Sequence, residues 1–561
     1  MTHPGEQFYP EGVRWDAPIE RGPIPDLLAK SAASFGSRPA LEFRDRPISF
    51  SELQGLVDRA AAAFLRAGYG KGSAIALYLG NSPDHPVNFF GGLKAGARIV
   101  HLSPLDGEIA LSHKLKDSGA RVLVTSNLAA LLPMALKFLD KGLLDKLIVC
   151  DDASWGDVGN RQMPLPVNPA IVTYSDFIKD AQPPASWPAI SADDIALLQY
   201  TGGTTGLPKG AMLTHGNLTS AVSIYDVWGA KARAERNVVE RVICVLPLFH
   251  IYALTVILLR CIKMGDLISL HQRFDVEAVM RDIEVKRATA FPGVPTMWIA
   301  IANLPDLDKR DLSSLAAAGS GGAPLPVEVA RIFERKTGLT LKSGWGMTET
   351  CSPGTGHPPT GPDKPGSIGL MLPGIEMDVV SLDDPTKVLP TGETGEIRIK
   401  GPNVTRGYWN REQDSASSFV GDRFLTGDIG YVDSDGYFYL VDRKKDMIIS
   451  GGFNVYPQMI EQAIYTHPAV QEVLVIGIPD DYRGEAAKAF VTLRAGAEPF
   501  SIEDLRAFLT GKVGKHELPA AVEFVAELPR TPVGKLSRHE LRSQQSTQPQ
   551  QQQQLATGAR S

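Results

Sequence analysis

Short apolar runs of the kind that form buried strands recur along this chain, and helix-like stretches separate them. Two such runs lie at 74–79 and 121–125, and the stretch at 89–96 between them reads as a helix. Further strand-like runs lie at 241–246 and 288–291. Strands that alternate with helices are typical of parallel sheets covered by helices. The sequence therefore predicts an α/β fold with layers of mostly parallel strands.

The length of the chain, 561 residues, predicts more than one domain. Between 366 and 407, glycines, prolines and alternating strands such as 396–400 favour a small β-rich subdomain. The charged cluster at 442–445 marks a further break, which is either a solvated turn or a hinge. We expect a large N-terminal domain at 1–441, a hinge at 442–445 and a small α+β domain at 446–542.

The region after the break has its own pattern of elements. We expect helices at 457–466 and 502–513, and strands at 473–478, 489–493 and 522–525. From residue 543 the chain becomes rich in glutamine, and no apolar residue appears before Leu555. Such a segment cannot bury enough apolar surface to fold, so we expect a disordered tail at 543–561.

The bulk properties exclude several classes of protein. A net charge of −6 argues against a general nucleic-acid binder. The longest apolar run, 251–259, is too short to span a bilayer, so at most peripheral membrane association is expected. The N-terminus has no basic-then-apolar leader, and the cysteines are scattered without a CxxC pair. We therefore expect a cytoplasmic protein with reduced thiols, and a homodimer stays open. The cysteines are Cys150, Cys244, Cys261 and Cys351.

The segment at 200–210 combines four glycines, three threonines and Lys209 within eleven residues. Glycines let the backbone approach a ligand closely, and exposed N–H groups, hydroxyls and an ammonium suit a polyphosphate. The segment is not a Walker A loop, because Lys209 is followed by Gly210 rather than by serine or threonine. Taken alone, it is either a phosphate-binding loop or a plain surface loop.

The order of residues in this loop resembles the phosphate-binding signature of the AMP-forming adenylating enzymes, which are acyl-CoA synthetases, peptide-synthetase adenylation domains and luciferases. Three further segments resemble that family in the same order: 321–325 (GGAPL), 344–350 (GWGMTET) and 426–428 (TGD). Each segment alone is weak, but their joint order over a long stretch identifies the chain as a member of the family.

The resemblance implies a site for ATP and Mg²⁺. It implies that the loop beginning at Thr201 binds the β- and γ-phosphates and that Thr348 binds the α-phosphate. It also implies that Thr201 and Glu349 bind Mg²⁺. It gives the ribose hydroxyls to Asp428, whose carboxylate can accept their hydrogen bonds. The family more often has tyrosine at position 345, where the aromatic ring lies against adenine. The residues assigned to the nucleotide are Thr201, Gly202, Gly203, Thr204, Thr205, Gly206, Lys209, Gly321, Gly322, Ala323, Trp345, Gly346 and Asp428.

A motif near the C-terminus, 530–537 (RTPVGKLS), resembles the one that carries the family's catalytic lysine, here Lys535. In isolation Lys535 would be a solvated turn lysine. The resemblance implies that it bridges the carboxylate and the α-phosphate during adenylation, so the small domain must close over ATP. The cluster at 442–445 matches the family hinge, with Asp442 as pivot, Arg443 on the ribose and Lys445 near the nucleotide.

The segment 450–457 matches the one that faces the site during thioester formation, where Gly451 and Gly452 would let the pantetheine arm of CoA pass close to the backbone. Many relatives carry a second lysine at the position of Ile449, and its absence leaves any cationic aid to this step unassigned.

His250 follows a strand-like run in 247–250 (PLFH) and is either a core histidine or a residue at the carboxylate end of the acyl pocket. The resemblance implies the second role, with His250 moving between the two steps. The apolar stretch 251–259 is a buried helix, a wall of the acyl tunnel, or both. Arg260 lies ten residues beyond His250, about 15 Å along a helix, and either faces solvent or meets a second carboxylate of the substrate.

The nearest resemblance is to bacterial fatty acyl-CoA synthetases, and the N-terminal sequence also resembles dicarboxylate–CoA ligases of the pimeloyl type. The expected reaction joins a medium- or long-chain fatty acid, or an α,ω-dicarboxylic acid, to CoA through an acyl-adenylate, with ATP, Mg²⁺ and CoA. A free-standing adenylation enzyme that loads a carrier protein is the alternative. A non-catalytic sensor is disfavoured, because Lys535, Glu349 and Asp428 are all present.

Overall fold

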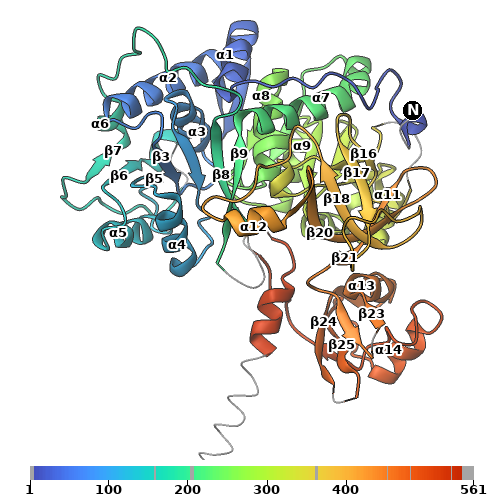
Figure 1. Ribbon diagram of the computed structural model, residues 1–561. Helices are drawn as coiled ribbons and strands as arrows, with labels where there is room; N and C mark the ends of the chain where they lie inside the picture. Colours follow the sequence, from blue (N-terminus) through green and yellow to red (C-terminus); the bar gives the residue numbers. More distant parts are fainter. Residues whose placement is uncertain are drawn as a thin grey trace, which may run out of the picture.

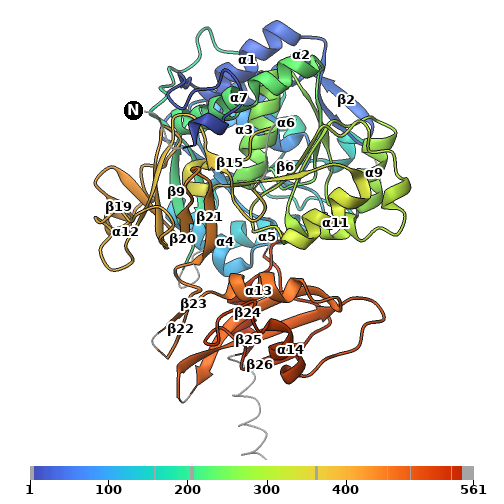
Figure 2. The same cartoon turned by 90° about the vertical axis from the view of Figure 1, so that its right-hand side faces the viewer.

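The computed structural model describes residues 5–156, 159–201, 207–359, 364–451, 453–480, 482–531 and 534–545. A large N-terminal part carries a smaller C-terminal domain on one side, and the same arrangement is visible in two perpendicular views (Figures 1 and 2). The predicted mixed α/β architecture is confirmed. Among the described residues, no helix is both long enough and apolar enough to cross a bilayer.

The first sheet of the N-terminal part has seven strands, all parallel to their neighbours except β8 and β9, which pair antiparallel. Successive side chains of a strand point to opposite faces, so Ile75 and Leu77 enter one core while Ala74 and Ala76 enter another. The strand order is β7 (Ile171–Thr173), β6 (Lys146–Cys150), β5 (Val122–Ser126), β3 (Ala74–Leu77), β4 (Arg98–His101), β8 (Ile195–Thr201) and β9 (Lys209–Thr214).

The second sheet has nine strands and a parallel centre with antiparallel edges. Its order is β16 (Leu370–Met371), β15 (Thr355–Gly356), β14 (Leu341–Trp345), β13 (Ala317–Ser320), β12 (Ala290–Gly293), β10 (Arg241–Cys244), β11 (Leu267–Leu270), β1 (Pro39–Phe43) and β2 (Arg46–Ser49). The carboxyl ends of β13 and β14 carry two of the segments that the sequence assigned to the nucleotide, because loops that follow parallel strands gather at one edge of a sheet.

Helices fill the space between and around these sheets, and one core cluster contains residues of both sheets and of α1, α2 and α3. Local signals start several helices: the Thr214 side chain accepts from the Asn217 amide in a capping box that begins α7. The helices of this part are α1 (Ile24–Phe35), α2 (Phe50–Arg66), α3 (Asp84–Lys94), α4 (Glu108–Ser118), α5 (Leu132–Asp140), α6 (Tyr174–Ile178), α7 (His215–Arg236), α8 (Arg260–Met264), α9 (Val276–Glu284), α10 (Pro295–Ala302) and α11 (Val327–Thr337).

The β-rich subdomain has the predicted character, with antiparallel pairing throughout. Its strands are β17 (Glu376–Val380), β18 (Gly395–Lys400), β19 (Phe419–Val420), β20 (Arg423–Val432) and β21 (Phe438–Arg443), with the short helix α12 (Glu412–Ser417). Asp442 and Arg443, assigned to the hinge, end β21 and pair with Ile429 and Asp428 of β20. A turn at 444–446 then leads into the small domain.

The C-terminal domain is the predicted α+β unit, built on β22 (Ile448–Ser450), β23 (Phe453–Val455), β24 (Val470–Asp480), β25 (Gly484–Leu493) and β26 (Ala521–Phe524), with α13 (Pro457–Tyr465) and α14 (Ile502–Leu509). The expected helix at 502–513 is too long, since α14 ends at Leu509 and Gly511 follows with a φ of 81°.

The predicted tail begins too early. Residues 538–545 form a helix in which Leu541 is buried, and the Ser543 hydroxyl donates to the His539 carbonyl oxygen. Burial of this leucine anchors the turn that contains 543–545, although the glutamine-rich composition gave no sign of it. Residues 546–561 of the expected tail lie outside the described residues.

Candidate active site

A cavity of about 1780 Å³ lies where the two domains meet, and it gathers most of the residues that the sequence assigned to the nucleotide and to catalysis. Gly202, Gly203, Thr204, Thr205, Gly206 and Gly452 fall outside the described residues. Gly451 lies in the β22–β23 hairpin of the small domain and does not line the cavity. The assigned residues that line it are Thr201, Lys209, His250, Gly321, Gly322, Ala323, Trp345, Gly346, Thr348, Glu349, Asp428, Arg443, Lys445 and Lys535.

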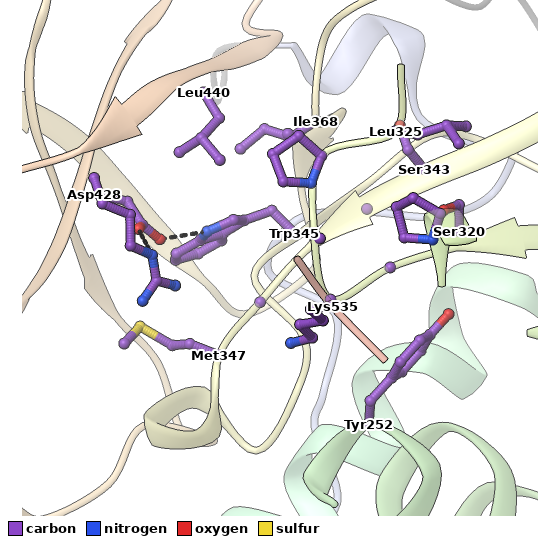
Figure 3. Close-up of a pocket in the computed structure, with 18 of the residues that line it drawn as sticks. Tyr252, Ser320, Leu325, Ser343, Trp345, Met347, Ile368, Asp428, Leu440 and Lys535 are labelled. Atoms are coloured by element: carbon purple, nitrogen blue, oxygen red, sulfur yellow. Dashed lines mark hydrogen bonds and ion pairs between the residues drawn. The ribbon is translucent and has the colours of Figure 1, made fainter. Parts of the chain in front are cut away.

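Trp345, at the end of β14, and Asp428, in β20, are in direct contact and both line the cavity (Figure 3). The indole Nε1 donates to Asp428 Oδ2 at 2.7 Å. Arg443 Nε lies 2.8 Å from the other oxygen, Oδ1, and the opposing charge of Asp428 raises the pKa of Arg443. The Asp428 carboxylate is fully buried and therefore held in one orientation.

Two glycines next to Trp345 are required by the space around them. A β-carbon on Gly346 would lie 1.3 Å from the Ser352 carbonyl oxygen, so no other residue fits without moving the backbone. A β-carbon on Gly354 would lie 2.4 Å from the Trp345 ring. The backbone therefore packs directly on the indole, which fixes the plane of the ring at the cavity wall.

Glu349 lies in the short 3-10 helix η5 (Thr348–Thr350) and is almost completely buried. Tyr408 donates its hydroxyl hydrogen to Glu349 Oε1 at 2.8 Å, and the Thr405 amide donates to the Glu349 carbonyl oxygen at 2.7 Å. Burial raises the pKa of Glu349, while the hydrogen bond from Tyr408 opposes that rise. Tyr408 was not assigned to the site from sequence, because an aromatic residue 59 positions away gives no local signal.

Lys209 and Thr201 face each other across the antiparallel pair β8–β9, on either side of the glycine-rich segment of the sequence. Lys209 Nζ forms an ion pair with Asp414 Oδ1 at 2.8 Å and lies 5.5 Å from the centre of the Tyr408 ring. Thr201 and Lys209 thus both line the cavity, and the Lys209 side chain is partly exposed beside Asp414.

Lys535 reaches into the cavity from the small domain, as Figure 3 shows. A β-carbon on Gly322 would lie 2.8 Å from Lys535 Cε, so the lysine stem occupies the space left free by this glycine, whose φ is +81°. Thr296 Oγ1 donates to the Gly534 carbonyl oxygen at 3.1 Å, a contact between the two domains. Burial, followed by the charge of Arg443, lowers the pKa of Lys535 to about 8.

His250 lies in the turn after β10 and lines the cavity. Gln199 donates from Nε2 to the Phe249 carbonyl oxygen at 3.0 Å, and its Oε1 lies 3.0 Å from His101 Nδ1. Since Oε1 can only accept, His101 carries its proton on Nδ1. Burial, followed by the charges of Lys535 and His101, lowers the pKa of His250 to about 3, so its ring is neutral. His101 and Gln199 were not assigned to the site from sequence, and together they hold the peptide that precedes His250.

The apolar stretch after His250 is a π-helix (η3, Ala253–Leu259), in which only Val256 lines the cavity. Tyr252 precedes it and packs against Gly321, where a β-carbon would lie 2.9 Å from the tyrosine ring. The remaining residues of η3 are buried in the core, so the stretch is mainly a core helix with a narrow contact to the cavity. Arg260 does not line the cavity, and its guanidinium packs against Gly229 of α7.

Asp442 is held inside the small domain by its side chain. Its Oδ1 accepts from the Arg443 amide at 2.7 Å and lies 3.2 Å from Arg538 Nη1, and its Oδ2 accepts from the Gln458 amide at 2.8 Å. Burial raises the pKa of Asp442, and the Arg538 charge opposes the rise. The backbone of Asp442 therefore pairs with the large domain through β21, while its carboxylate contacts Gln458 and Arg538 of the small domain.

Both domains of this chain are similar to known protein families. Residues 28–409 match the family described as AMP-binding enzyme, and residues 459–535 match the AMP-binding enzyme C-terminal domain. The chain belongs to the AMP-binding enzyme family. The resemblance stated from the sequence motifs is thereby confirmed, and both domains of an AMP-binding enzyme lie in their expected order along the chain.

Similar AMP-binding enzymes include proteins named as CoA ligases. The long-chain-fatty-acid–CoA ligase of Bacillus subtilis (strain 168) is 36% identical over 555 residues, which cover 95% of this chain and 96% of that protein. The feruloyl-CoA synthase of Amycolatopsis sp is 37% identical over 509 residues, which cover 88% and 93%. The solved O-succinylbenzoate coenzyme A synthetase of Bacillus subtilis, in complex with ATP and a magnesium ion, is 28% identical with a TM-score of 0.77, covering 92% of this chain and 99% of that chain.

Proposed function

We propose that this AMP-binding enzyme is an acyl-CoA synthetase that joins a carboxylic acid to CoA through an acyl-adenylate, releasing AMP and diphosphate. The observation that carries the proposal is the position of Lys535. This small-domain lysine enters the cavity between the glycine loop at Gly322 and the Trp345–Asp428 pair. A cation placed between a nucleotide wall and an acyl wall suits attack by one anion on another.

The residues around Trp345 fit the nucleotide of ATP. The indole gives a flat face for adenine, and Asp428 Oδ1 is buried beside the Arg443 charge but accepts no hydrogen bond from any described residue. A buried acceptor in this state is costly, so a ribose hydroxyl that donates to it would be bound firmly. Arg443 and Lys445 also line the cavity, where Arg443 would lie at the ribose and Lys445 near the nucleotide. The phosphate tail would extend toward Lys209 and Thr201.

The donor set around Glu349 fits Mg²⁺, a hard cation that prefers oxygen ligands. Glu349 and Thr201 would hold the ion, which would offset the negative charge of the phosphates. Among the described residues, Glu349 forms no ion pair with a cationic side chain. Tyr408 keeps the Glu349 carboxylate turned in one direction through its hydrogen bond.

In the first step, an oxygen of the substrate carboxylate attacks the α-phosphorus of ATP, and the bond to the β-phosphate oxygen breaks to release diphosphate. The Lys535 ammonium holds the attacking carboxylate and the α-phosphate together. The neutral His250 ring closes the carboxylate end, where its position depends on the peptide held by Gln199. In the second step the CoA thiol releases its proton to water, its sulfur attacks the acyl carbon, and the bond from that carbon to the phosphate oxygen of AMP breaks, so that AMP leaves.

The acid substrate is proposed to be a medium- or long-chain fatty acid or an α,ω-dicarboxylic acid. The relative named long-chain-fatty-acid–CoA ligase supports the fatty acid, since it is similar over nearly the whole chain. Val256 and Tyr252 offer apolar contacts on the acyl side. Arg260 would meet a second carboxylate only if the side chains between it and the cavity moved. The four cysteines are free and buried, which is compatible with a cytoplasmic enzyme.

An assay of AMP release tests the proposal with purified protein, ATP, Mg²⁺ and CoA across mono- and dicarboxylic acids of graded length. AMP and acyl-CoA should appear in equal amounts. Formation of ADP and phosphate instead would contradict the adenylate mechanism. The alternative, loading of an acyl group onto a carrier protein, would be indicated if a panel of carrier proteins accepted the acyl group and CoA did not.

A further inference from the structure

The two oxygens of the Asp428 carboxylate have different surroundings, although both are buried. Oδ2 accepts a hydrogen bond from Trp345 Nε1 at 2.7 Å. Within the part of the chain that the structure describes, no group donates a hydrogen bond to Oδ1, because Arg443 Nε, although only 2.8 Å away, does not direct its hydrogen at this atom. The protein therefore commits a directed hydrogen bond to Oδ2, whereas Oδ1 is paired with a charge and keeps its full capacity to accept hydrogen bonds.

The side chain at position 345 causes this difference. An indole carries an N–H donor on the edge of its ring, whereas phenylalanine has none and tyrosine has its hydroxyl at the far end of the ring. The close packing of Gly354 on the ring keeps the donor aimed at Asp428. A flat ring alone would serve adenine equally well, so the N–H group adds a second role.

We propose that Trp345 is a positioning residue for ribose recognition, which hydrogen-bonds Asp428 Oδ2 and so makes Oδ1 the stronger acceptor for a ribose hydroxyl. The two ribose hydroxyls are then recognised unequally. This inference rests on the proposed function, in that the ribose of ATP lies on Asp428. One hydroxyl donates to a buried, charged oxygen. The other is left with Arg443, whose side chain is 48% exposed, so water competes for that contact.

Adenylation by the wild-type enzyme with ATP, 2′-deoxyATP and 3′-deoxyATP tests the inequality directly. The analogue that lacks the hydroxyl bound to Oδ1 should lose about tenfold to a hundredfold in kcat/KM, as expected for a hydrogen bond to a buried charge. The other analogue should lose less than about threefold. Equal losses with the two analogues would overturn the proposal, whatever the behaviour of any variant.

A variant separates the N–H group from the ring. Trp345→Phe keeps an aromatic face but removes the hydrogen bond to Oδ2, so the two oxygens become more equal acceptors and the ratio between the two analogues should fall toward one. If Trp345→Phe discriminated between the two analogues as strongly as the wild type does, the proposal would also be overturned. The dissociation constants of AMP, 2′-deoxyAMP and 3′-deoxyAMP, measured by calorimetry, should show the same pattern without turnover.

The chain offers a matched control in Trp155. Its Nε1 donates to Asp84 Oδ1 at 3.0 Å, and Asp84 is 3% exposed, so Trp155→Phe also removes an indole N–H from a buried aspartate. Neither residue lines the cavity. Trp155→Phe should lower stability but keep the wild-type discrimination between the analogues. Absence of AMP formation with ATP for every acid would instead reject the proposed function, and the nucleotide affinities would still decide the role of Trp345.

Discussion

The charge of Lys535 can be tested through the pH dependence of adenylation. Burial in the cavity lowers the pKa of Lys535 to about 8, so the ammonium is present below that pH and is lost above it. Because kcat/KM reports the ionisation of the free enzyme, it should be constant below pH 8 and fall about tenfold for each pH unit above it. The measurement is diphosphate release from ATP and acid without CoA, between pH 6.5 and 10.

Two variants of Lys535 separate the charge from its titration. Arginine stays charged throughout this range, so Lys535→Arg should be slower than the wild type but show no fall above pH 8. Lys535→Ala should lose about a hundredfold to a thousandfold in adenylation at pH 7, in line with the loss of a preorganised charge. It should still form thioester from supplied acyl-adenylate and CoA. A wild-type profile that stays flat to pH 10, or an equal fall in Lys535→Arg, would refute the reasoning.

Three other changes test separate parts of the structure. Asp442→Pro fixes φ at the proposed pivot and should slow one half-reaction far more than the other in single-turnover assays, whereas the control Asp442→Ala should affect the two more evenly. Gln199→Met removes the donor to the Phe249 carbonyl oxygen and should raise KM for the acid about tenfold with kcat within about threefold, and an unchanged KM would count against the positioning role. Gly346→Ala should lower the free energy of unfolding by about 3 kcal/mol or more in urea titrations, because its methyl group would meet the Ser352 carbonyl oxygen.

The sequence predicted the family and fold class correctly because both depend on local signals. Strand-like runs near 74–79 and 121–125 appear as β3 and β5, and the glycine and threonine motifs keep their order whatever the tertiary contacts are. Helix ends were less reliable: 502–513 was too long because a glycine with positive φ follows Thr510, and the start of the tail was placed too early because a single buried leucine anchors the last helix.

Contacts between distant segments could not be predicted from one sequence. Trp345 and Asp428 are 83 positions apart, and Tyr408 and Glu349 are 59 apart, so no local pattern joins them. The π-helix was also not anticipated, because an apolar run without polar positions has no period that distinguishes it from an α-helix.

The strand pair β20–β21 brings Asp428 directly opposite Arg443, the residue after Asp442. If the small domain turns at Asp442, as proposed, the motion starts one residue from the side chain that balances the charge of Asp428. The Asp428–Arg443 ion pair would then couple nucleotide binding directly to the orientation of the small domain. The order in which products leave would follow from this: diphosphate could depart before the turn, whereas AMP would loosen only as Arg443 is drawn away.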